Sequence, residues 1–194
     1  MESNQSSPAT VDLLEGSIFL QEGKFKAARE SYEATLQNEA ENLEAIYGLG
    51  IICQYEGNYA KARKYFQQAL DLHGASGAIL NSYGIVAAHL GDTDAAKQAL
   101  EKAVDLEPDF LDAWKNLAEI YLTTEEYEKG IKTYQEILKQ NADDIDALLN
   151  VARLYYTVDD IDSTKYILQR VLEIEPENKS AKESLEKLQK DAAT

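Results

Sequence analysis

Apolar residues recur along this chain at intervals of three and four, which is the period of an amphipathic α-helix. One run consists of Leu117, Ile120 and Tyr121, and a second run follows a polar turn at Tyr127, Ile131, Tyr134, Ile137 and Leu138. Polar and charged residues occupy the positions between them. The pattern predicts pairs of amphipathic helices joined by short turns.

The same pattern returns every 34 residues, without insertions. A small residue inside a helical run recurs at Gly16, Gly50, Gly84, Ala118 and Ala152. A second series is Ala28, Ala62, Ala96, Gly130 and Thr164, and a turn series is Gly23, Gly57, Gly91, Glu125 and Asp159. Together they predict five helix-turn-helix repeats at 9–42, 43–76, 77–110, 111–144 and 145–178.

Each repeat has room for two helices separated by the turn series. Glycine at the turn ends a helix at low cost, and Pro108 and Pro176 stand at junctions between repeats, where a helix must stop. The small residues let paired helices approach closely, and we expect Phe25, Tyr59 and Tyr127 to fill the adjoining space.

The two ends of the array differ in their apolar content. We expect residues 1–8 to form a flexible tail and residues 179–194 to form a capping helix and tail, with a narrow stripe of Ala181, Leu185 and Leu188. The first helix carries more than one stripe: Val11, Leu13, Leu14, Ile18, Phe19 and Leu20. Either residues 1–8 cover this surface, or Val11, Leu14 and Ile18 serve self-association or docking of a partner.

The repeat resembles the tetratricopeptide repeat family. The fourth repeat supplies Trp114, Leu117, Ala118, Tyr121, Tyr127 and Tyr134, and the second supplies Leu49, Gly50, Tyr59, Ala62, Phe66 and Ala69. The resemblance extends over residues 9–178. It implies an all-α, right-handed superhelical solenoid whose first helices line a concave groove, closed at the C-terminus by the capping helix.

In this family, ligands commonly lie against certain first-helix positions, and we transfer these by position. They correspond here to Leu13, Ser17, Tyr47, Ile51, Tyr55, Asn81, Ile85 and His89, which are largely apolar, and to Lys115, Asn116, Asn150 and Arg153, which are polar. Such a surface suits an extended segment or an amphipathic helix of another protein. Asn116 and Asn150 would either bind a peptide backbone or bridge neighbouring helices.

One subclass of the family grips the C-terminal carboxylate of chaperones with Lys, Asn and Arg side chains. Its pattern is missing here: aligned from the first repeat, the clamp positions are Leu13, Ser17, Gly48, Ala78 and Ser82. Aligned from the fourth repeat, Lys115 is present but Glu119 stands beside it. We therefore do not expect a carboxylate clamp for chaperones.

Charge and composition narrow the choice of partners. The chain has 19 basic and 35 acidic residues, a net charge of −16 that repels nucleic acid and anionic lipid. His73 and His89 lie in different repeats and the single Cys53 lies among apolar neighbours, so we expect neither a metal or other cofactor nor catalysis. We expect Cys53 to be a packed thiol and Trp114 to lie in the core.

The N-terminus has no signal-peptide pattern, and no apolar run is long enough to insert into a membrane. We expect a cytoplasmic protein, although a signal or anchor removed beforehand would leave no trace in this sequence. The predicted function is a non-catalytic adaptor or scaffold that binds a peptide segment or helix of another protein in the groove. The alternative is a self-assembling unit that forms homo-oligomers through its apolar first repeat.

Overall fold

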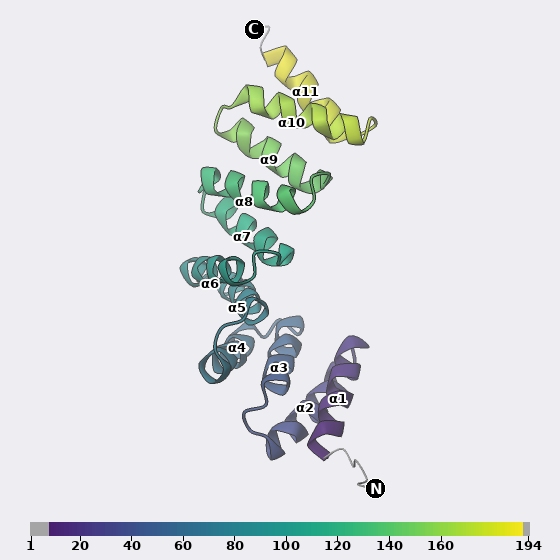
Figure 1. The fold of residues 1–194 in the computed structure, drawn as a ribbon, viewed down its shortest axis with the longest axis vertical. Coiled ribbons are helices and arrows are strands. Elements are labelled where there is room, and N and C mark those ends of the chain that lie inside the picture. Colours follow the sequence, from purple (N-terminus) through teal and green to yellow (C-terminus); the bar gives the residue numbers. More distant parts are fainter. Residues whose placement is uncertain (1–7, 192–194) are drawn as a thin grey trace. The chain divides into compact units, whose positions relative to one another are not determined.

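The computed structural model describes residues 8–191, which are helical apart from turns and short connections (Figure 1). The predicted tail at 1–8 and the end of the predicted 179–194 segment lie largely outside this range. The helices are α1 (Pro8–Gln21), α2 (Phe25–Asn38), α3 (Leu43–Tyr55), α4 (Tyr59–His73), α5 (Gly77–His89), α6 (Thr93–Leu106), α7 (Leu111–Thr123), α8 (Tyr127–Gln140), α9 (Ile145–Thr157), α10 (Ile161–Ile174) and α11 (Lys179–Asp191). The prediction of an all-α helical solenoid is confirmed.

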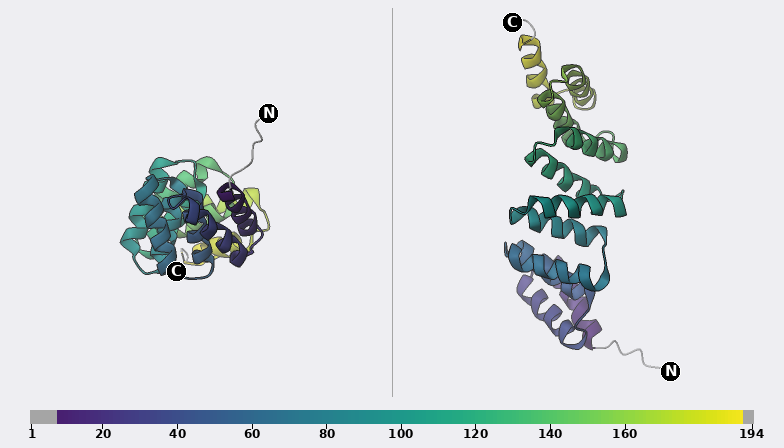
Figure 2. Two further views of the ribbon diagram at one scale, coloured as in Figure 1. Left: turned by 90° about the horizontal axis from the view of Figure 1, so that it is seen from below. Right: turned by 90° about the vertical axis from the view of Figure 1, so that its left-hand side faces the viewer.

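The chain divides into two compact units, Met1–Glu107 and Pro108–Thr194. In the first unit, α1 pairs with α2, α3 with α4 and α5 with α6; in the second, α7 pairs with α8 and α9 with α10. Each second helix also packs against the first helix of the next pair within its unit, and α11 packs against α10. Figure 2 shows these helical hairpins from two further directions.

The turns inside the helix pairs share one backbone conformation. Residues of the turn series have positive φ in all five places: Gly23 (71°), Gly57 (74°), Gly91 (77°), Glu125 (59°) and Asp159 (62°). One residue later, a backbone N–H donates to a carbonyl five residues back, as from Asp92 to Ala87 (2.9 Å) and from Glu126 to Tyr121 (2.9 Å). This is the Schellman ending of a helix, and it depends on the left-handed residue.

Polar residues start many of the helices by accepting hydrogen bonds from the first turn. Asp144 accepts from the N–H of Ala147 (2.9 Å) and Asp160 from the N–H of Ser163 (3.0 Å). Asn42, Asn58, Ser76 and Asp92 act in the same way on α3, α4, α5 and α6. Turn and cap together fix where each helix begins and ends.

The small-residue series allows close helix contacts, but the partner side chains differ from those predicted. A Cβ added to Gly16 would lie 2.7 Å from the Tyr32 ring, and one added to Gly50 would lie 2.5 Å from Phe66. Leu100 takes the corresponding place against Gly84. The prediction that Phe25, Tyr59 and Tyr127 fill this space is wrong, because these residues lie in the first turn of the second helix and remain only half-buried.

Each unit has its own apolar core. In the first unit, Ile46, Phe66, Ile79 and Val86 join α3, α4 and α5. In the second, Leu148, Leu168, Val171, Ala181 and Leu188 join α9, α10 and α11. Ala181, Leu185 and Leu188 are the stripe predicted for the capping helix, and the stripe does pack onto this core.

Cys53 and Trp114, both predicted to lie in the core, differ in how deeply they are buried. Cys53 is completely buried, as predicted for a packed thiol. Trp114 is only half-buried: it packs at the edge of a core cluster while its indole N–H donates to the Pro108 carbonyl (2.8 Å). An indole that must reach a hydrogen-bond partner cannot withdraw fully into an apolar interior.

Candidate functional site

In the first unit, the predicted binding residues on α3 are partly committed to packing. The Tyr47 hydroxyl lies 2.9 Å from the Ser82 hydroxyl on α5, and its ring centroid lies 5.6 Å from that of Phe66. Ile51 is half-buried against the same core. Tyr47 and Ile51 therefore hold repeats together, and only part of each side chain remains for a ligand.

The other predicted residues of α1 and α5 are also engaged. Leu13 packs partly buried into the core of α1 to α3, and the Ser17 hydroxyl hydrogen-bonds the Leu13 carbonyl (3.1 Å). Asn81 is 8 % exposed and Ile85 is half-buried. His89 stacks on Tyr59, with ring centroids 4.2 Å apart. Of these residues, His89 remains exposed, whereas Asn81 is buried and Leu13, Ser17 and Ile85 are half-buried.

The exposed apolar groups of the first unit include Tyr55 and a set of residues on α1. Tyr55 is 72 % exposed and stacks on Phe25, with centroids 5.3 Å apart. Val11, Leu14 and Ile18 are exposed on α1, and Leu14 is the most exposed of the three at 62 %. The three predicted self-association residues thus form one exposed stripe, whereas Leu13, Phe19 and Leu20 pack inward.

In the second unit, the predicted polar residues interact with one another and with capping groups. The Lys115 ammonium lies 3.8 Å from the Asp144 carboxylate. The Asn150 amide donates to the Asp146 carbonyl (2.9 Å) and accepts from the Arg153 guanidinium (3.0 Å). Asn150 therefore bonds within its own helix instead of bridging two helices. Asn116 is half-buried on α7.

A pocket of about 390 Å³ is lined by residues of α9, α10 and α11. Figure 1 labels these three helices. Its lining residues are Leu149, Asn150, Ala152, Arg153, Tyr156, Thr164, Leu168, Ser180, Ser184, Lys187 and Leu188. Asn150 and Arg153 were predicted from the sequence, and the structure brings them together here. The apolar part of the lining comes from the core shared by the three helices.

The contribution of α11 to this pocket was not predicted from the sequence. Ser184 and Lys187 stand 34 residues after Asn150 and Arg153, so they occupy the same positions on α11 as those residues occupy on α9. We assigned residues 179–194 only a capping role. Counting one further period would have identified α11 as another helix of the first-helix type.

The pocket carries positive charge in an otherwise acidic protein. Arg153 and Lys187 are its ionisable cations, and no carboxylate is found among its lining residues within 8–191. The Lys187 ammonium lies 5.5 Å from the centre of the Tyr156 ring. Burial raises the pKa of the nearby Tyr134 phenol, and the charge of Arg153 acts against that rise.

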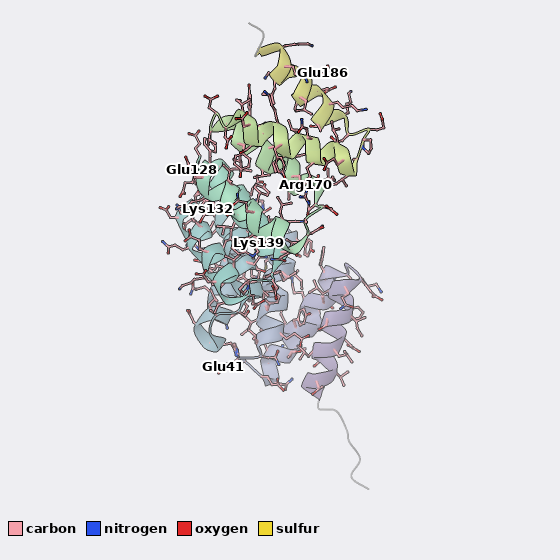
Figure 3. All side chains as sticks on the ribbon, turned by 45° about the horizontal axis from the view of Figure 1, so that its top comes forward. Glu41, Glu128, Lys132, Lys139, Arg170 and Glu186 are labelled. Atoms are coloured by element: carbon pink, nitrogen blue, oxygen red, sulfur yellow. The ribbon has the colours of Figure 1, made fainter. Side chains whose placement is uncertain are left out.

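Some charged side chains on the second helices of the second unit are paired locally. On α8, Lys139 pairs with Glu136 (2.6 Å), while Glu128 and Lys132 project outward (Figure 3). The Arg170 guanidinium on α10 donates to the Ala142 carbonyl (3.1 Å). Tyr166 is a large exposed aromatic side chain on α10, outside the pocket. The second helices of this unit thus present charged outer surfaces.

Two general features of residues 8–191 bear on function. No three His, Cys, Asp or Glu side chains within this range are grouped as a metal ion would require. None of the helices described there combines the length and the apolar character needed to span a membrane.

Comparison with known proteins agrees with the repeat pattern. Two tetratricopeptide repeat models match, one at residues 41–107 and the other at 87–154, and together they cover more than half of the chain. No curated protein matches significantly. The chain belongs to the tetratricopeptide repeat family, whose members are generally protein-interaction modules without catalytic activity.

Solved structures show the same fold at low sequence identity. YrrB, described as a tetratricopeptide repeat protein with an unusual peptide-binding site, is 18 % identical, with a TM-score of 0.77 and 92 % of each chain covered. MamA from Desulfovibrio magneticus RS-1 is 21 % identical, with a TM-score of 0.78 and coverage of 90 % of this chain and 98 % of that one. PilF from Pseudomonas aeruginosa is 19 % identical, with a TM-score of 0.74 and coverage of 90 % and 79 %.

Proposed function

We propose that this protein is a non-catalytic adaptor or scaffold that binds a peptide segment or an amphipathic helix of another protein along the first helices of its repeats. The observation that carries the proposal is the pocket among α9, α10 and α11. It contains Asn150 and Arg153, which were selected from sequence position alone, together with the exposed Tyr156. The peptide-binding site named for YrrB supports a role of the same kind for this fold.

The chemistry of the pocket suits a polypeptide ligand. Its floor of Leu149, Leu168 and Leu188 would take an apolar side chain, and its volume of about 390 Å³ accommodates one or two side chains. Tyr156 offers a rigid aromatic surface at low entropic cost. Hydroxyl and guanidinium donors around the rim would orient the bound segment.

The test is selection of binding peptides from a phage-displayed random library against the full chain. We expect Tyr156→Ala to weaken the selected peptides at least about tenfold, since exposed aromatic residues are typical hot spots. Tyr166→Ala is the matched control, because Tyr166 is an exposed tyrosine (65 %) of the neighbouring helix α10 and does not line the pocket. Affinities would be measured by calorimetry.

Either of two results contradicts the proposal. A library that yields no binding peptide argues against a peptide-binding surface. Peptides that are weakened by Tyr166→Ala and unaffected by Tyr156→Ala would place binding on the second helices instead.

A second candidate is self-assembly through α1, favoured by the stripe of Val11, Leu14 and Ile18. These residues are three and four apart, so they share one helix face, and all are exposed. Light scattering after size exclusion should then show a mass that rises with concentration, and Leu14→Glu should abolish the rise. Gln21→Glu adds the same charge at the end of α1 and should leave the rise in mass unchanged. A monomer at every concentration contradicts self-assembly.

A further inference from the structure

The pocket among α9, α10 and α11 has a chemical preference that the peptide-binding proposal leaves open. Two cations, Arg153 and Lys187, enter it from two different helices. The two residues hold equivalent positions 34 residues apart. The placement therefore puts positive charge on both sides of one small cavity.

These cations have unused hydrogen-bonding capacity. Arg153 has five N–H donors, of which one bonds Asn150. Lys187 has three donors, and among residues 8–191 its one described contact is with the face of the Tyr156 ring. Neither forms an ion pair with a carboxylate in that range, whereas several other basic residues do, including Arg29 with Glu56 and Arg63 with Asp92.

None of the carboxylates described on the surrounding helices lines the pocket. Asp146 on α9, Asp162 on α10 and both Glu183 and Glu186 on α11 are outside its lining; Figure 3 labels Glu186 on α11. Glu119 on α7 influences the same Tyr134 phenol as Arg153 but forms no ion pair with Arg153 in the described chain. In a protein with 35 acidic residues, a cavity whose charged lining residues in the described chain are both cations is a selective feature.

The serine hydroxyl groups and the apolar floor of the pocket further restrict the chemistry of its ligand. Ser180 and Ser184 line the pocket from α11 and can each donate a hydrogen bond. The floor is apolar, formed by Leu149, Leu168 and Leu188. We propose that the pocket binds the side-chain carboxylate of an Asp or Glu in the partner segment, with an adjacent apolar side chain on the leucine floor. This inference rests on the proposed function, because it names the chemistry of that partner.

The test uses three N-acetylated dipeptides titrated into the full chain and followed by NMR shifts of α9 and α11 amides. The probes are N-acetyl-glutamyl-leucine amide, its neutral isostere N-acetyl-glutaminyl-leucine amide, and N-acetyl-glutaminyl-leucine with a free terminal carboxylate. We expect the first to bind at least tenfold more tightly than the second, a difference of about 1.4 kcal/mol, as for a charge-assisted hydrogen bond. It should also bind more tightly than the third.

Substitutions test whether Arg153 and Lys187 cause the preference for the glutamyl probe. Lys187→Gln and Arg153→Gln should each remove the tenfold preference. Lys182→Gln is the control on α11: it removes one charge from a residue that pairs with Glu177 (2.8 Å) outside the pocket. Circular dichroism spectra of all variants should match that of the wild type, since the substituted residues are not buried.

Each contrary outcome overturns the inference. Equal affinity for the acidic and neutral amides, or no binding of any probe, removes the carboxylate preference. Tighter binding of the free-terminus probe would assign the pocket to a terminal carboxylate instead of a side chain. If peptides from the phage library still require Tyr156 in these cases, the peptide-binding function stands while the carboxylate assignment fails.

Discussion

The ring of Tyr32 on α2 lies directly against the backbone of Gly48 on α3, where a Cβ would come within 2.5 Å of the ring carbon Cζ. Tyr32 is 2 % exposed and also fills the space beside Gly16 on α1. The Tyr32 ring therefore packs against α1 within its own helix pair and also against α3 of the next pair. Neighbouring repeats are coupled through this contact.

Gly48→Ala should destabilise the protein by about 1–3 kcal/mol, because the added methyl group overpacks a buried contact with a rigid ring. Gly130→Ala on α8 is the matched control. Its Cβ would lie 3.1 Å from a methyl carbon of Leu154, and alanine favours the helix, so we expect a change within about 1 kcal/mol. Urea denaturation followed by circular dichroism measures both. A Gly48→Ala variant as stable as the wild type would contradict the close contact.

Glu125→Gly should stabilise the protein by about 0.5–1 kcal/mol. Glu125 has φ 59° in a turn where three other repeats have glycine, and left-handed backbone costs a non-glycine residue about 1–2 kcal/mol. The greater freedom of glycine in the unfolded chain offsets part of that gain. Lys132→Gly, at an exposed position in the interior of α8, should instead cost about 1 kcal/mol. Loss of stability in Glu125→Gly would show that the turn does not strain glutamate.

The cap of α10 should make stability depend on pH. The N–H of Ser163 donates to the Asp160 carboxylate, and this bond holds the pKa of Asp160 below its ordinary value, with a further contribution from the Ser163 side chain. A lowered pKa in the folded state means that the ionised cap stabilises the protein above the unfolded pKa of about 4, and that this stabilisation is lost as pH falls through the folded pKa.

Asp160→Asn separates the charge from the cap geometry, because asparagine accepts a similar hydrogen bond without ionising. The wild type should be the more stable protein at pH 7, and the difference in urea midpoint should shrink toward zero in acid. A difference that stays constant from pH 7 to acid would show that the charge of Asp160 contributes nothing.

The start of α5 receives a second cap from the end of its own helix pair. The Glu107 carboxylate, just after α6, accepts from the N–H of Gly77 at 2.7 Å. Glu107→Ala should cost about 0.5–2 kcal/mol, as for the loss of a helix cap. Asp105→Ala removes an exposed acidic residue of the same helix and should cost less than about 0.5 kcal/mol. Equal effects of the two substitutions would refute the capping role of Glu107.

Much of the fold could be predicted because each repeat meets the same local demands. The positions that need a turn, a cap or a small side chain recur every 34 residues, and the boundaries of the helices follow from them. The prediction was wrong about Phe25, Tyr59 and Tyr127. Helical spacing indicates which apolar side chains share one face of a helix. Which ring reaches a given glycine depends on how two helices cross.

The predicted binding residues share a position in the repeat and differ in their surroundings. Tyr47 and Asn81 are engaged by packing or burial, whereas Arg153 lines an open pocket. A sequence position does not report how much of a side chain its neighbours cover. The same reason explains why α11 was predicted as a cap and its side chains in the pocket were missed.

The sequence by itself determined the family, the helical hairpins, the left-handed turns and the acidic character of the chain. These properties depend on residue type and on local spacing, which are readable without a structure. Tertiary structure alone decided which first-helix residues remain accessible and that Arg153 and Lys187 enter one cavity. Those properties arise when helices far apart in the chain are brought together, because burial and local charge depend on every neighbour that packing supplies.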